Sequence, residues 1–492
     1  MKKKLTMLFI SIFFAIGNLF AFVNTFKLSE YKLPELKRQA LIIDFNLSTK
    51  NRNTEDINYE QEKEKIRKNS FNSDFEINYN KFINTPLKQQ ELNLSLKSNS
   101  SVTFVKSDYD EDDYHRKQLL FNIISNFKLN NIHRFYILPN KFIETDYDFS
   151  YEFNRNYNKT KVVDEDEDFT FQSNYVPTTN TVEGTLFLKT GSGRIDEVQD
   201  AVHAIYIFNE LAKQDRIQEI KDKSKIMEFA EFISKLKNKR FFDSRIRRIY
   251  EITAIDSFLT SKNYVKKSDA KYFTTLSDIW EYSNIPVRKS GQRFSIMLAP
   301  KGYYYHFKDD ETKIEYPSLN FSTGLEWTYQ NPINLYWQRS LLVSAIGGIN
   351  NGKIYIDDSK DGFKVNMPYI ALQSSYGMGF YPDTRTEINF YLSSNYMQVF
   401  KSSAKEVLLI EGNAFKIASD ISLHYYISPK IRINIASNVS YMLQGDKNKN
   451  IYITFENPNS EIVSSFNPYI YEEQPRKSFN YGLEFNLSYE IF

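Results

Sequence analysis

The chain has 492 residues, a net charge of +2, 25% charged residues and no cysteine. This length allows a large domain with an inserted or appended unit. The balanced charge lacks the strongly basic face that nucleic-acid binding requires, so no nucleic-acid partner is expected. The lack of cysteine excludes a disulfide framework and a lipid-anchored cysteine.

Residues 1–21 have the pattern of a secretory signal peptide. Lysines at positions 2–4 precede an apolar run over residues 5–16, and Gly17 and Ala21 are small residues suited to cleavage. The cleavage position stays open between them. Beyond this segment no run of about 18 apolar residues occurs, so a membrane-spanning helix is not expected. We therefore expect an exported protein.

Residues 38–190 are predicted to form about six β-strands, because apolar and polar residues alternate in several short runs. Ile43, Phe45 and Leu47 mark the first strand. The polar stretch from Asn51 to Ser70 is expected to be unstructured.

Two acidic runs in this region are expected on loops at the outer surface. They are Asp108–Asp113 and Asp164–Asp168. The second has the alternate aspartates of a calcium loop but lacks the glycine and the distal glutamate of an EF-hand. Calcium binding there is left open, beside a solvated loop and a contact with lipopolysaccharide-bound divalent ions.

Near residue 190 the spacing of the apolar residues changes from every second residue to every third or fourth residue. Residues 191–286 are therefore predicted to form three to four amphipathic helices that pack as a small bundle. The helices are expected around residues 198–212, 226–236, 242–259 and 268–282. The bundle carries a basic cluster, interpreted either as a solvated face or as a surface for lipid phosphates or an acidic periplasmic partner. It consists of Lys237, Lys239, Arg240, Arg245, Arg247 and Arg248.

Residues 292–492 are predicted to form eight strands, because the two-residue period returns there. Short links and long polar links alternate between these strands. The short ones are Gln330–Ile333, Pro382–Arg385 and Ser428–Lys430; the long ones are Gly347–Gly362, Lys401–Gly412 and Gln444–Ser478.

The last predicted strand, Tyr481–Phe492, alternates strictly and ends at an aromatic residue. Its apolar face carries Leu483, Phe485, Leu487, Tyr489 and Ile491. With 40 Phe and 35 Tyr the chain also has the aromatic content of membrane-interface girdles, although a biased genome composition gives the same enrichment. Together with the alternating links, this strand resembles the last strand of bacterial outer-membrane β-barrel proteins.

The resemblance covers residues 38–190 and 292–492 and concerns architecture. It implies an all-β antiparallel transmembrane barrel of about 14 strands, within a range of 12 to 16, in the outer membrane of a Gram-negative bacterium. Both termini and the helical insert, as a periplasmic unit or a plug, then lie on the periplasmic side. The implied partners are outer-membrane lipid and lipopolysaccharide, the barrel-assembly machinery and a periplasmic protein.

The barrel interpretation assigns each side chain to the lumen or to the lipid. The predicted lumen-lining residues are Glu326, Glu387, Lys416, Asp420, Arg432, Glu484 and Glu490. The predicted membrane-facing aromatic residues are Phe321, Trp327, Tyr329, Phe390, Tyr396, Tyr425, Tyr441, Phe485 and Tyr489. Tyr489 and Phe492 form the predicted C-terminal assembly signal, although Phe492 shares its face with Glu490. Arg339 falls on the lipid side, so we expect a bulge there or a position near the membrane interface.

The predicted function is that of a porin-like passive channel or transporter for an unknown solute. The alternatives are a scaffold that anchors the helical bundle in an envelope or secretion complex, and a soluble exported β-sandwich protein. No enzyme, metal site or cofactor is predicted, because the five histidines are scattered. Ser422 and His424 share a polar face but have no recognisable nucleophile motif.

Overall fold

The computed structural model describes residues 26–57, 63–109, 114–164, 169–237, 244–282, 287–357, 362–400, 412–428, 431–444 and 477–489. The predicted signal peptide, residues 110–113 and 165–168 of the two acidic runs, and the residues from Glu490 to Phe492 lie outside them. Within them, fifteen β-strands and four α-helices follow a short 3-10 helix at Leu28–Glu30.

The strands before the helices are mostly long. They are β1 (Leu36–Ile57), β2 (Lys63–Asn84), β3 (Lys88–Tyr109), β4 (Tyr114–Leu138), β5 (Lys141–Asp164), β6 (Phe169–Tyr175) and β7 (Thr178–Glu197). The strands after the helices are β8 (Lys289–Lys308), β9 (Lys313–Pro332), β10 (Trp337–Ile356), β11 (Phe363–Phe380), β12 (Thr386–Val399), β13 (Gly412–Ser428), β14 (Ile431–Gln444) and β15 (Lys477–Tyr489). Eight strands, β8 to β15, thus follow the helices among the described residues.

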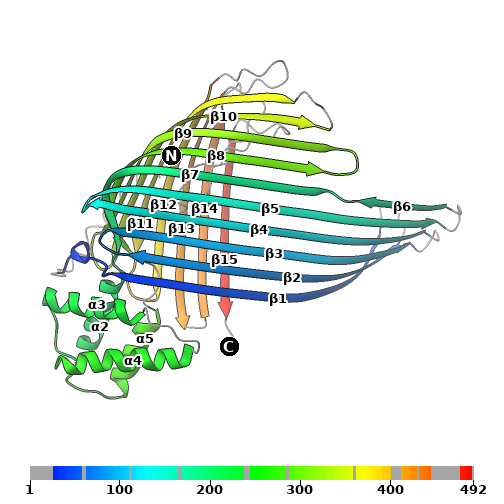
Figure 1. Cartoon of the computed structure of the whole chain (residues 1–492). Helices are drawn as coiled ribbons and strands as arrows, with labels where there is room; N and C mark the ends of the chain where they lie inside the picture. Colours follow the sequence, from blue (N-terminus) through cyan, green and yellow to red (C-terminus); the bar gives the residue numbers. More distant parts are fainter. Residues whose placement is uncertain are drawn as a thin grey trace, which may run out of the picture.

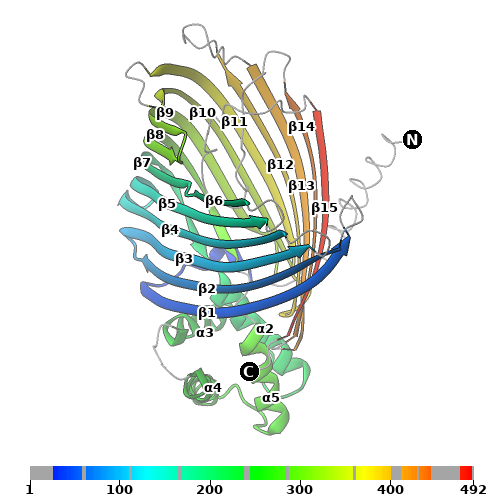
Figure 2. The same ribbon diagram turned by 90° about the vertical axis from the view of Figure 1, so that its right-hand side faces the viewer.

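All strands belong to one antiparallel sheet in which each strand pairs with its neighbour along the chain. The continuous path runs from β1 to β15 through fourteen strands, and β6 pairs only with the outer part of β5. The sheet is strongly curved (Figure 1 and Figure 2). Among the described residues, β1 and β15 are its two edges, and no ladder joins them.

The sheet places its apolar side chains outside and its polar side chains inside. On β9, Leu325 is 47% exposed, whereas the neighbouring Thr328 and Ser322 are buried. The same distribution recurs on β8, β10, β11 and β12, where the buried polar residues include Ser295, Ser344, Ser375, Asn389, Ser393 and Asn395. A soluble sheet buries its apolar face, so this inside-out pattern is that of a barrel wall that faces lipid.

The concave face also carries an apolar group, which the sequence did not predict. It consists of buried side chains from β7 to β13, among them Phe187, Met297, Tyr316, Met367 and Met397. These side chains fill part of the space inside the curved sheet, so the interior is not lined by polar residues alone.

The four helices form one unit inserted between β7 and β8. They are α2 (Gln199–Lys213), α3 (Lys223–Lys237), α4 (Ser244–Ser261) and α5 (Ala270–Tyr282), and we call them the helical cap. The two flanking strands pair up to Glu197 and Lys289, and the N–H of Val198 donates to the carbonyl of Arg288 over 2.8 Å. The cap therefore replaces the turn of a β-hairpin.

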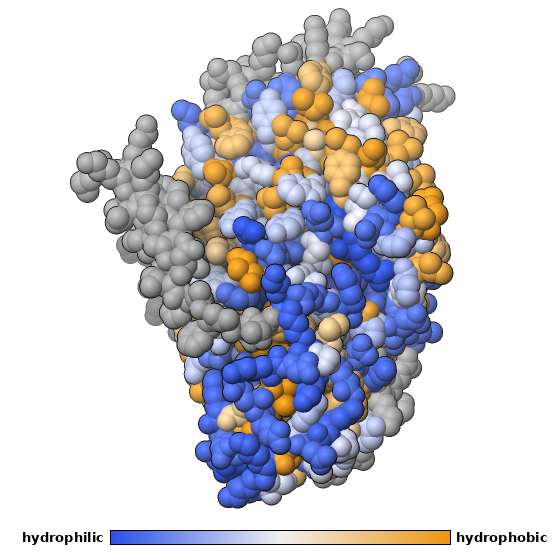
Figure 3. Space-filling view, turned by 90° about the vertical axis from the view of Figure 1, so that its left-hand side faces the viewer, coloured by the Kyte–Doolittle hydropathy of each residue, from blue (hydrophilic) through white to orange (hydrophobic). Residues whose placement is uncertain are grey.

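The cap is held together by an apolar core around α2, whose residues 199–208 are all buried. The Phe229 ring on α3 lies 4.8 Å from Phe208 and 5.1 Å from Phe258 between ring centroids. The segment before β1 completes this core through Phe26, Leu28, Tyr31 and Leu33. The outer surface of the cap is mainly hydrophilic, and hydrophobic residues gather higher, over the strands (Figure 3). Within the described residues, no helix combines the length and the apolar character needed to cross a membrane.

Three sequence predictions about element boundaries were wrong. The stretch 51–70 is not unstructured, because β1 continues to Ile57 and β2 begins at Lys63. Residues 191–197 belong to β7 rather than to the helical unit. Residues 347–356 belong to β10, so only the end of that predicted long link connects strands. In each case ladder pairing extends a strand into polar or glycine-rich sequence that lacks clear alternation.

Candidate functional site

A belt of charged side chains crosses the concave face of the sheet near the helical cap. Arg134 on β4 lies opposite Glu144 on β5, and Lys189 on β7 lies opposite Glu144 on its other side. Nε of Arg134 donates to Oε2 of Glu144 over 2.5 Å, and Nζ of Lys189 lies 3.3 Å from Oε1. Glu144 is 1% exposed. A charge buried this deeply is tolerated only when paired, and Glu144 has a cation on each side.

Glu326 extends the belt to β9. Its Oε2 atom lies 3.7 Å from Nζ of Lys189, so positive and negative side chains alternate from Arg134 to Glu326. Arg293 on β8 and Asp146 on β5 are buried beside them and act on Lys189 through their charges. The belt therefore offers both signs of charge on the inner wall.

Gln89 on β3 connects the belt to the end of the sheet. Its Oε1 atom accepts hydrogen bonds from Arg134 over 3.1 Å and from the Tyr136 hydroxyl over 2.8 Å. Its Nε2 atom donates to Oδ1 of Asn84 and to Oδ1 of Asp196. One amide thus joins four side chains from β2, β4 and β7.

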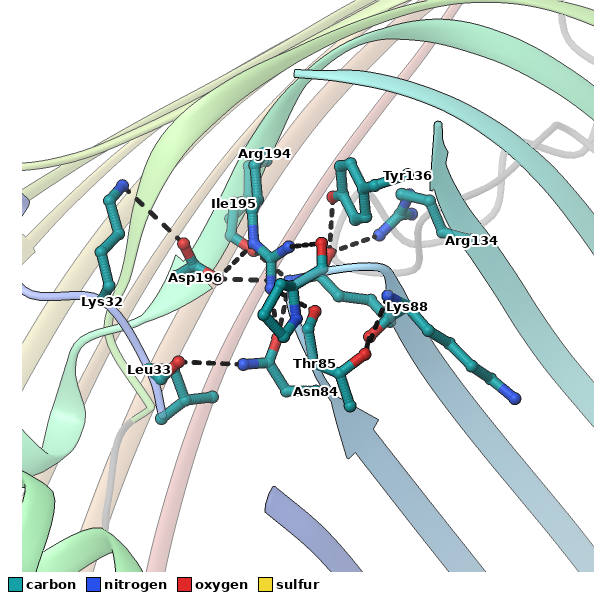
Figure 4. Close-up of polar contacts among 12 residues, drawn as sticks. Lys32, Leu33, Asn84, Thr85, Lys88, Arg134, Tyr136, Arg194, Ile195 and Asp196 are labelled. Atoms are coloured by element: carbon teal, nitrogen blue, oxygen red, sulfur yellow. Dashed lines mark hydrogen bonds and ion pairs between the residues drawn. The ribbon is translucent and has the colours of Figure 1, made fainter. Parts of the chain in front are cut away.

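Arg194 closes this network at the turn between β2 and β3. Its guanidinium donates to Oδ1 of Asp196 over 3.0 Å, to Oδ1 of Asn84 over 2.9 Å and to the carbonyl oxygens of Thr85 and Pro86. It also stacks over the Tyr136 ring. Asn84 donates to the carbonyl of Leu33, so the segment that packs on the cap is fixed to the same network (Figure 4).

A vestibule of about 400 Å³ lies at the cap-side ends of β8 to β12. Its wall carries Glu326 from the belt, Glu387 at the start of β12 and Arg288 just before β8. Asn389 donates to Oε1 of Glu387 over 2.6 Å. The vestibule therefore connects the belt with the base of the cap.

Arg288 joins the cap to the turn between β9 and β10. Its guanidinium donates to the carbonyl oxygens of Leu335 over 2.5 Å, Asn334 over 2.6 Å and Trp337 over 2.9 Å. It also stacks over the Tyr381 ring. Burial lowers the pKa of Arg288 to about 10, so the side chain keeps its charge at neutral pH. A buried cation held by carbonyl oxygens fixes this turn against the cap.

Further contacts join the cap to the turn between β11 and β12. The Tyr206 hydroxyl on α2 donates to the carbonyl of Tyr381 over 3.1 Å. Arg385 forms an ion pair with Asp278 on α5, and its guanidinium lies 4.6 Å from the Tyr282 ring centroid. Two short turns of the sheet are therefore in direct contact with the cap.

The interior of the cap contains a second buried polar cluster. Nζ of Lys237 lies 2.8 Å from Oδ1 of Asp200 and 2.6 Å from Nδ1 of His203, whose ring stacks on Trp280. Arg38 reaches Asp200 from β1. Burial and the Lys237 charge lower the pKa of His203 well below its usual value. His203 is therefore neutral at physiological pH and accepts a hydrogen bond from Lys237.

Three members of the predicted basic cluster have described side chains, and its predicted role stays a prediction. Lys237 is partly buried, whereas Arg247 and Arg248 are exposed. Nε of Arg247 lies 2.7 Å from Oε1 of Glu251, and Arg248 lies 2.6 Å from Oε2 of Glu281. Lys239, Arg240 and the Arg245 side chain lie outside the described residues. The sequence pattern missed the acidic partners because they come from other turns and helices.

The predicted lumen residues are distributed over the inner wall. Glu326 belongs to the belt and Glu387 to the vestibule, whereas Lys416, Asp420, Arg432 and Glu484 lie farther along the sheet on β13 to β15. Asp420 accepts a hydrogen bond from Asn438 on β14. Glu490 lies outside the described residues, and the functional roles of the whole set stay predictions.

The predicted membrane-facing aromatic residues mostly lie on the exposed face. Phe321, Trp327, Tyr425, Tyr441 and Phe485 are exposed. Tyr329, Phe390 and Tyr396 are partly buried, and the Tyr489 side chain lies outside the described residues.

Arg339 lies on β10 close to its cap-side end. It is the third residue of the strand, in regular pairing with Asn331 and Met378, and its guanidinium stacks over the Tyr329 ring. The expected bulge is absent, and the alternative, a position near the membrane interface, stays a prediction.

Sequence reasoning missed most of the belt, including Gln89, Arg134, Glu144 and Lys189. For Arg134, Glu144 and Lys189 an apolar residue next in sequence was a usable signal, because Phe135, Ile143 and Leu188 are exposed on the outer face. No cluster of three potential metal ligands occurs among the described side chains. On β13, His424 lies 2.7 Å from the side-chain amide of Asn434, two residues from Ser422.

Comparison with known proteins gives only distant likenesses. No family model matches, and no curated protein matches. Among solved structures, the transport unit of the autotransporter AIDA-I from Escherichia coli is 9% identical with a TM-score of 0.27, covering 83% of this chain and 94% of that one. The β domain of the Bordetella autotransporter BrkA is 7% identical with a TM-score of 0.20, covering 92% and 98%.

These scores are too low to transfer any property from either protein. The chain itself has one antiparallel sheet with sequential pairing, an apolar outer face and a polar inner face. That combination is the architecture of bacterial outer-membrane β-barrel proteins, and the subfamily is not identified.

Proposed function

We propose that the protein lies in the outer membrane of a Gram-negative bacterium and acts as a passive channel or transporter for small hydrophilic solutes. The observation that carries this proposal is the vestibule, which joins the belt to the base of the cap. Its lining includes Glu326 and Glu387 together with Arg288 and Lys289. Charged and amide side chains of this kind replace part of the hydration shell of a polar solute.

In this proposal the cap lies on the periplasmic side and restricts entry to the vestibule. It is fixed through Arg288, Tyr206 and Arg385 to short turns of the sheet, and short turns face the periplasm in bacterial barrels. Outer-membrane lipid, lipopolysaccharide and the barrel-assembly machinery are the partners that this location implies. The proposal includes no enzymatic step.

Conductance in planar bilayers tests the channel directly. Neutralising the vestibule with the double variant Glu326→Gln and Glu387→Gln should shift ion selectivity toward anions, because Arg288 and Lys289 then remain as its charged residues. The matched control is Glu311→Gln, in the link between β8 and β9 at the opposite end of the sheet. Equal selectivity in the double variant and the control would contradict the proposal.

Removal of the cap gives a second test. Replacing residues 199–287 with Asn-Gly closes the hairpin between paired strands, and conductance should rise if the cap restricts entry. Heat-modifiable gel migration shows whether the variant still forms a folded barrel. The absence of conductance from both the complete chain and this folded variant would refute the channel.

A scaffold is the second candidate, and one observation favours it. A cleft of about 590 Å³ lies between the cap and the turns at residues 335–336 and 382–385. Glu210, Lys213 and Asp278 give it charges of both signs. If the protein is a scaffold, a partner cross-linked through Lys213 should be lost when the cap is removed, with the barrel still folded and no conductance in either form.

A further inference from the structure

A groove of about 800 Å³ lies on the outer face of the sheet, far from the helical cap. It crosses β5, β7, β8, β9, β10 and β11, which lie side by side (Figure 1). One cross-strand row of paired residues forms its length: Phe149, Gly184, Gly302, Leu319, Asn351 and Asn366. Alternation along each strand places this row on the face that carries the exposed apolar residues.

Two glycines hollow out the groove. Gly184 and Gly302 face each other across β7 and β8. A Cβ atom added to Gly302 would have no neighbour within 4 Å, and one added to Gly184 would meet only the Phe149 ring at 3.7 Å. At most other glycines of this sheet, an added Cβ atom would clash with neighbouring atoms. Gly184 and Gly302 differ, because the space next to them is open.

The wall of the groove is mainly apolar and aromatic. Phe149, Tyr304 and Leu319 are exposed along it, with Val182 and Pro317 beside them. In a barrel wall these side chains face the hydrocarbon of the membrane. A groove with such a wall fits an acyl chain that lies against the sheet.

Two lysines lie at one end of the groove. Lys353 on β10 and Lys364 on β11 are paired in register next to the link between these strands. Among the described residues, neither forms an ion pair, and Nζ of Lys353 lies 4.8 Å from the Tyr355 ring centroid. Like charges placed opposite each other on one face of a sheet are unfavourable unless an anion lies between them.

We propose that this groove binds a phosphate-bearing lipid of the membrane, with an acyl chain over the glycine pair and the phosphate between Lys353 and Lys364. The lysines lie at the end of the sheet opposite the cap, where the outer headgroups lie when the cap is periplasmic. The inference rests on the proposed membrane location of the barrel and does not require that the barrel conducts.

The test uses the complete chain reconstituted in phosphatidylcholine vesicles with a small fraction of spin-labelled phosphatidic acid or spin-labelled phosphatidylcholine. Electron spin resonance reports the fraction of each label that is immobilised on the protein. Phosphatidic acid should be preferred, and each substitution Lys353→Gln or Lys364→Gln should lower this preference about fivefold, as expected for one lysine near an anionic headgroup.

Two variants separate the headgroup from the groove. Gly302→Leu adds a side chain where an added Cβ atom meets no neighbour within 4 Å, and it should reduce immobilisation of both labels. Lys308→Gln is the matched control, because Lys308 lies at the same end of β8 but does not line the groove. Heat-modifiable migration confirms that each variant is folded.

Three results would overturn the proposal. The preference for phosphatidic acid could persist in the double lysine variant. Inorganic phosphate at millimolar concentration could displace the labelled lipid completely, which would assign the lysines to a free anion. Cross-linking could show a dimer that Gly302→Leu abolishes, which would assign the groove to a second copy of the chain. Conductance of the same vesicles is measured in parallel. If the protein does not conduct, the channel proposal fails, but the preference for phosphatidic acid should remain.

Discussion

Arg288 should be the side chain on which docking of the cap depends most. It donates four hydrogen bonds, three to carbonyl oxygens of residues 334–337 and one to Oε1 of Gln338. In the variant Arg288→Met the apolar stem is kept and all four donors are lost. The carbonyl oxygens of Leu335 and Trp337 then remain buried without this partner.

The expected loss follows from these contacts. A buried polar group left without a partner costs about 1 to 3 kcal/mol. Arg288→Met removes the partner of three carbonyl oxygens, and two of these hydrogen bonds are buried. We therefore expect docking of the turn to weaken by about 3 kcal/mol. This corresponds to a decrease of about a hundredfold in protection of its amides against hydrogen exchange. The reporting amides are those of Tyr336 and Trp337, which donate to Oδ1 of Asn334, and that of Tyr381, which donates to the carbonyl of Tyr336.

Hydrogen exchange followed by mass spectrometry on the folded protein in detergent measures this protection. Arg385→Met is the matched control, because its one ion pair with Asp278 is partly exposed and should contribute less than about 1 kcal/mol. Protection in Arg288→Met that stays within twofold of the unmodified protein would refute the role of Arg288 as the anchor of the cap.

Three further predictions concern stability. The cap should lose stability as the pH falls below about 6.5, because His203 becomes protonated in the unfolded state, whereas its lowered pKa keeps it neutral in the folded state. His203→Gln should abolish this loss, which melting curves at about pH 7.5 and 5 measure. Gly193 has a φ of +105°, so Gly193→Ala should destabilise the protein by more than about 1 kcal/mol in urea unfolding. Phe229→Ala should cost about 3 to 5 kcal/mol in the same assay, whereas the exposed Ile249→Ala should change stability by less than about 0.5 kcal/mol.

The sheet was largely predictable because its signal is local. Leu325 and Glu326 show which face of β9 is apolar without knowledge of any other strand. The polar parts of β1 and β2 were not predictable in this way. Lys50 pairs with Ser70 and Arg52 with Lys68, so these segments are extended because of the ladder between them rather than because of their own pattern.

The site was less predictable because it depends on register. The alternation along β9 predicted that Glu326 lies on the inner face. Its partner Lys189, however, comes from a strand that the helical cap separates from β9. Arg134 and Glu144 meet only because the tight turn after Leu138 sets the pairing of β4 with β5, with an irregularity at Tyr136. A single strand pattern contains no information on such pairs.

The direct test of the central claim is to compare the two faces of one strand in a membrane. The chain has no cysteine, so Ile421→Cys and Ser422→Cys each give one labelling site, on the outer and the inner face of β13. After labelling with bimane and reconstitution, lipids brominated in their acyl chains should quench the label at residue 421 and leave that at residue 422 largely unquenched. Equal quenching at both positions would contradict an outer-membrane barrel.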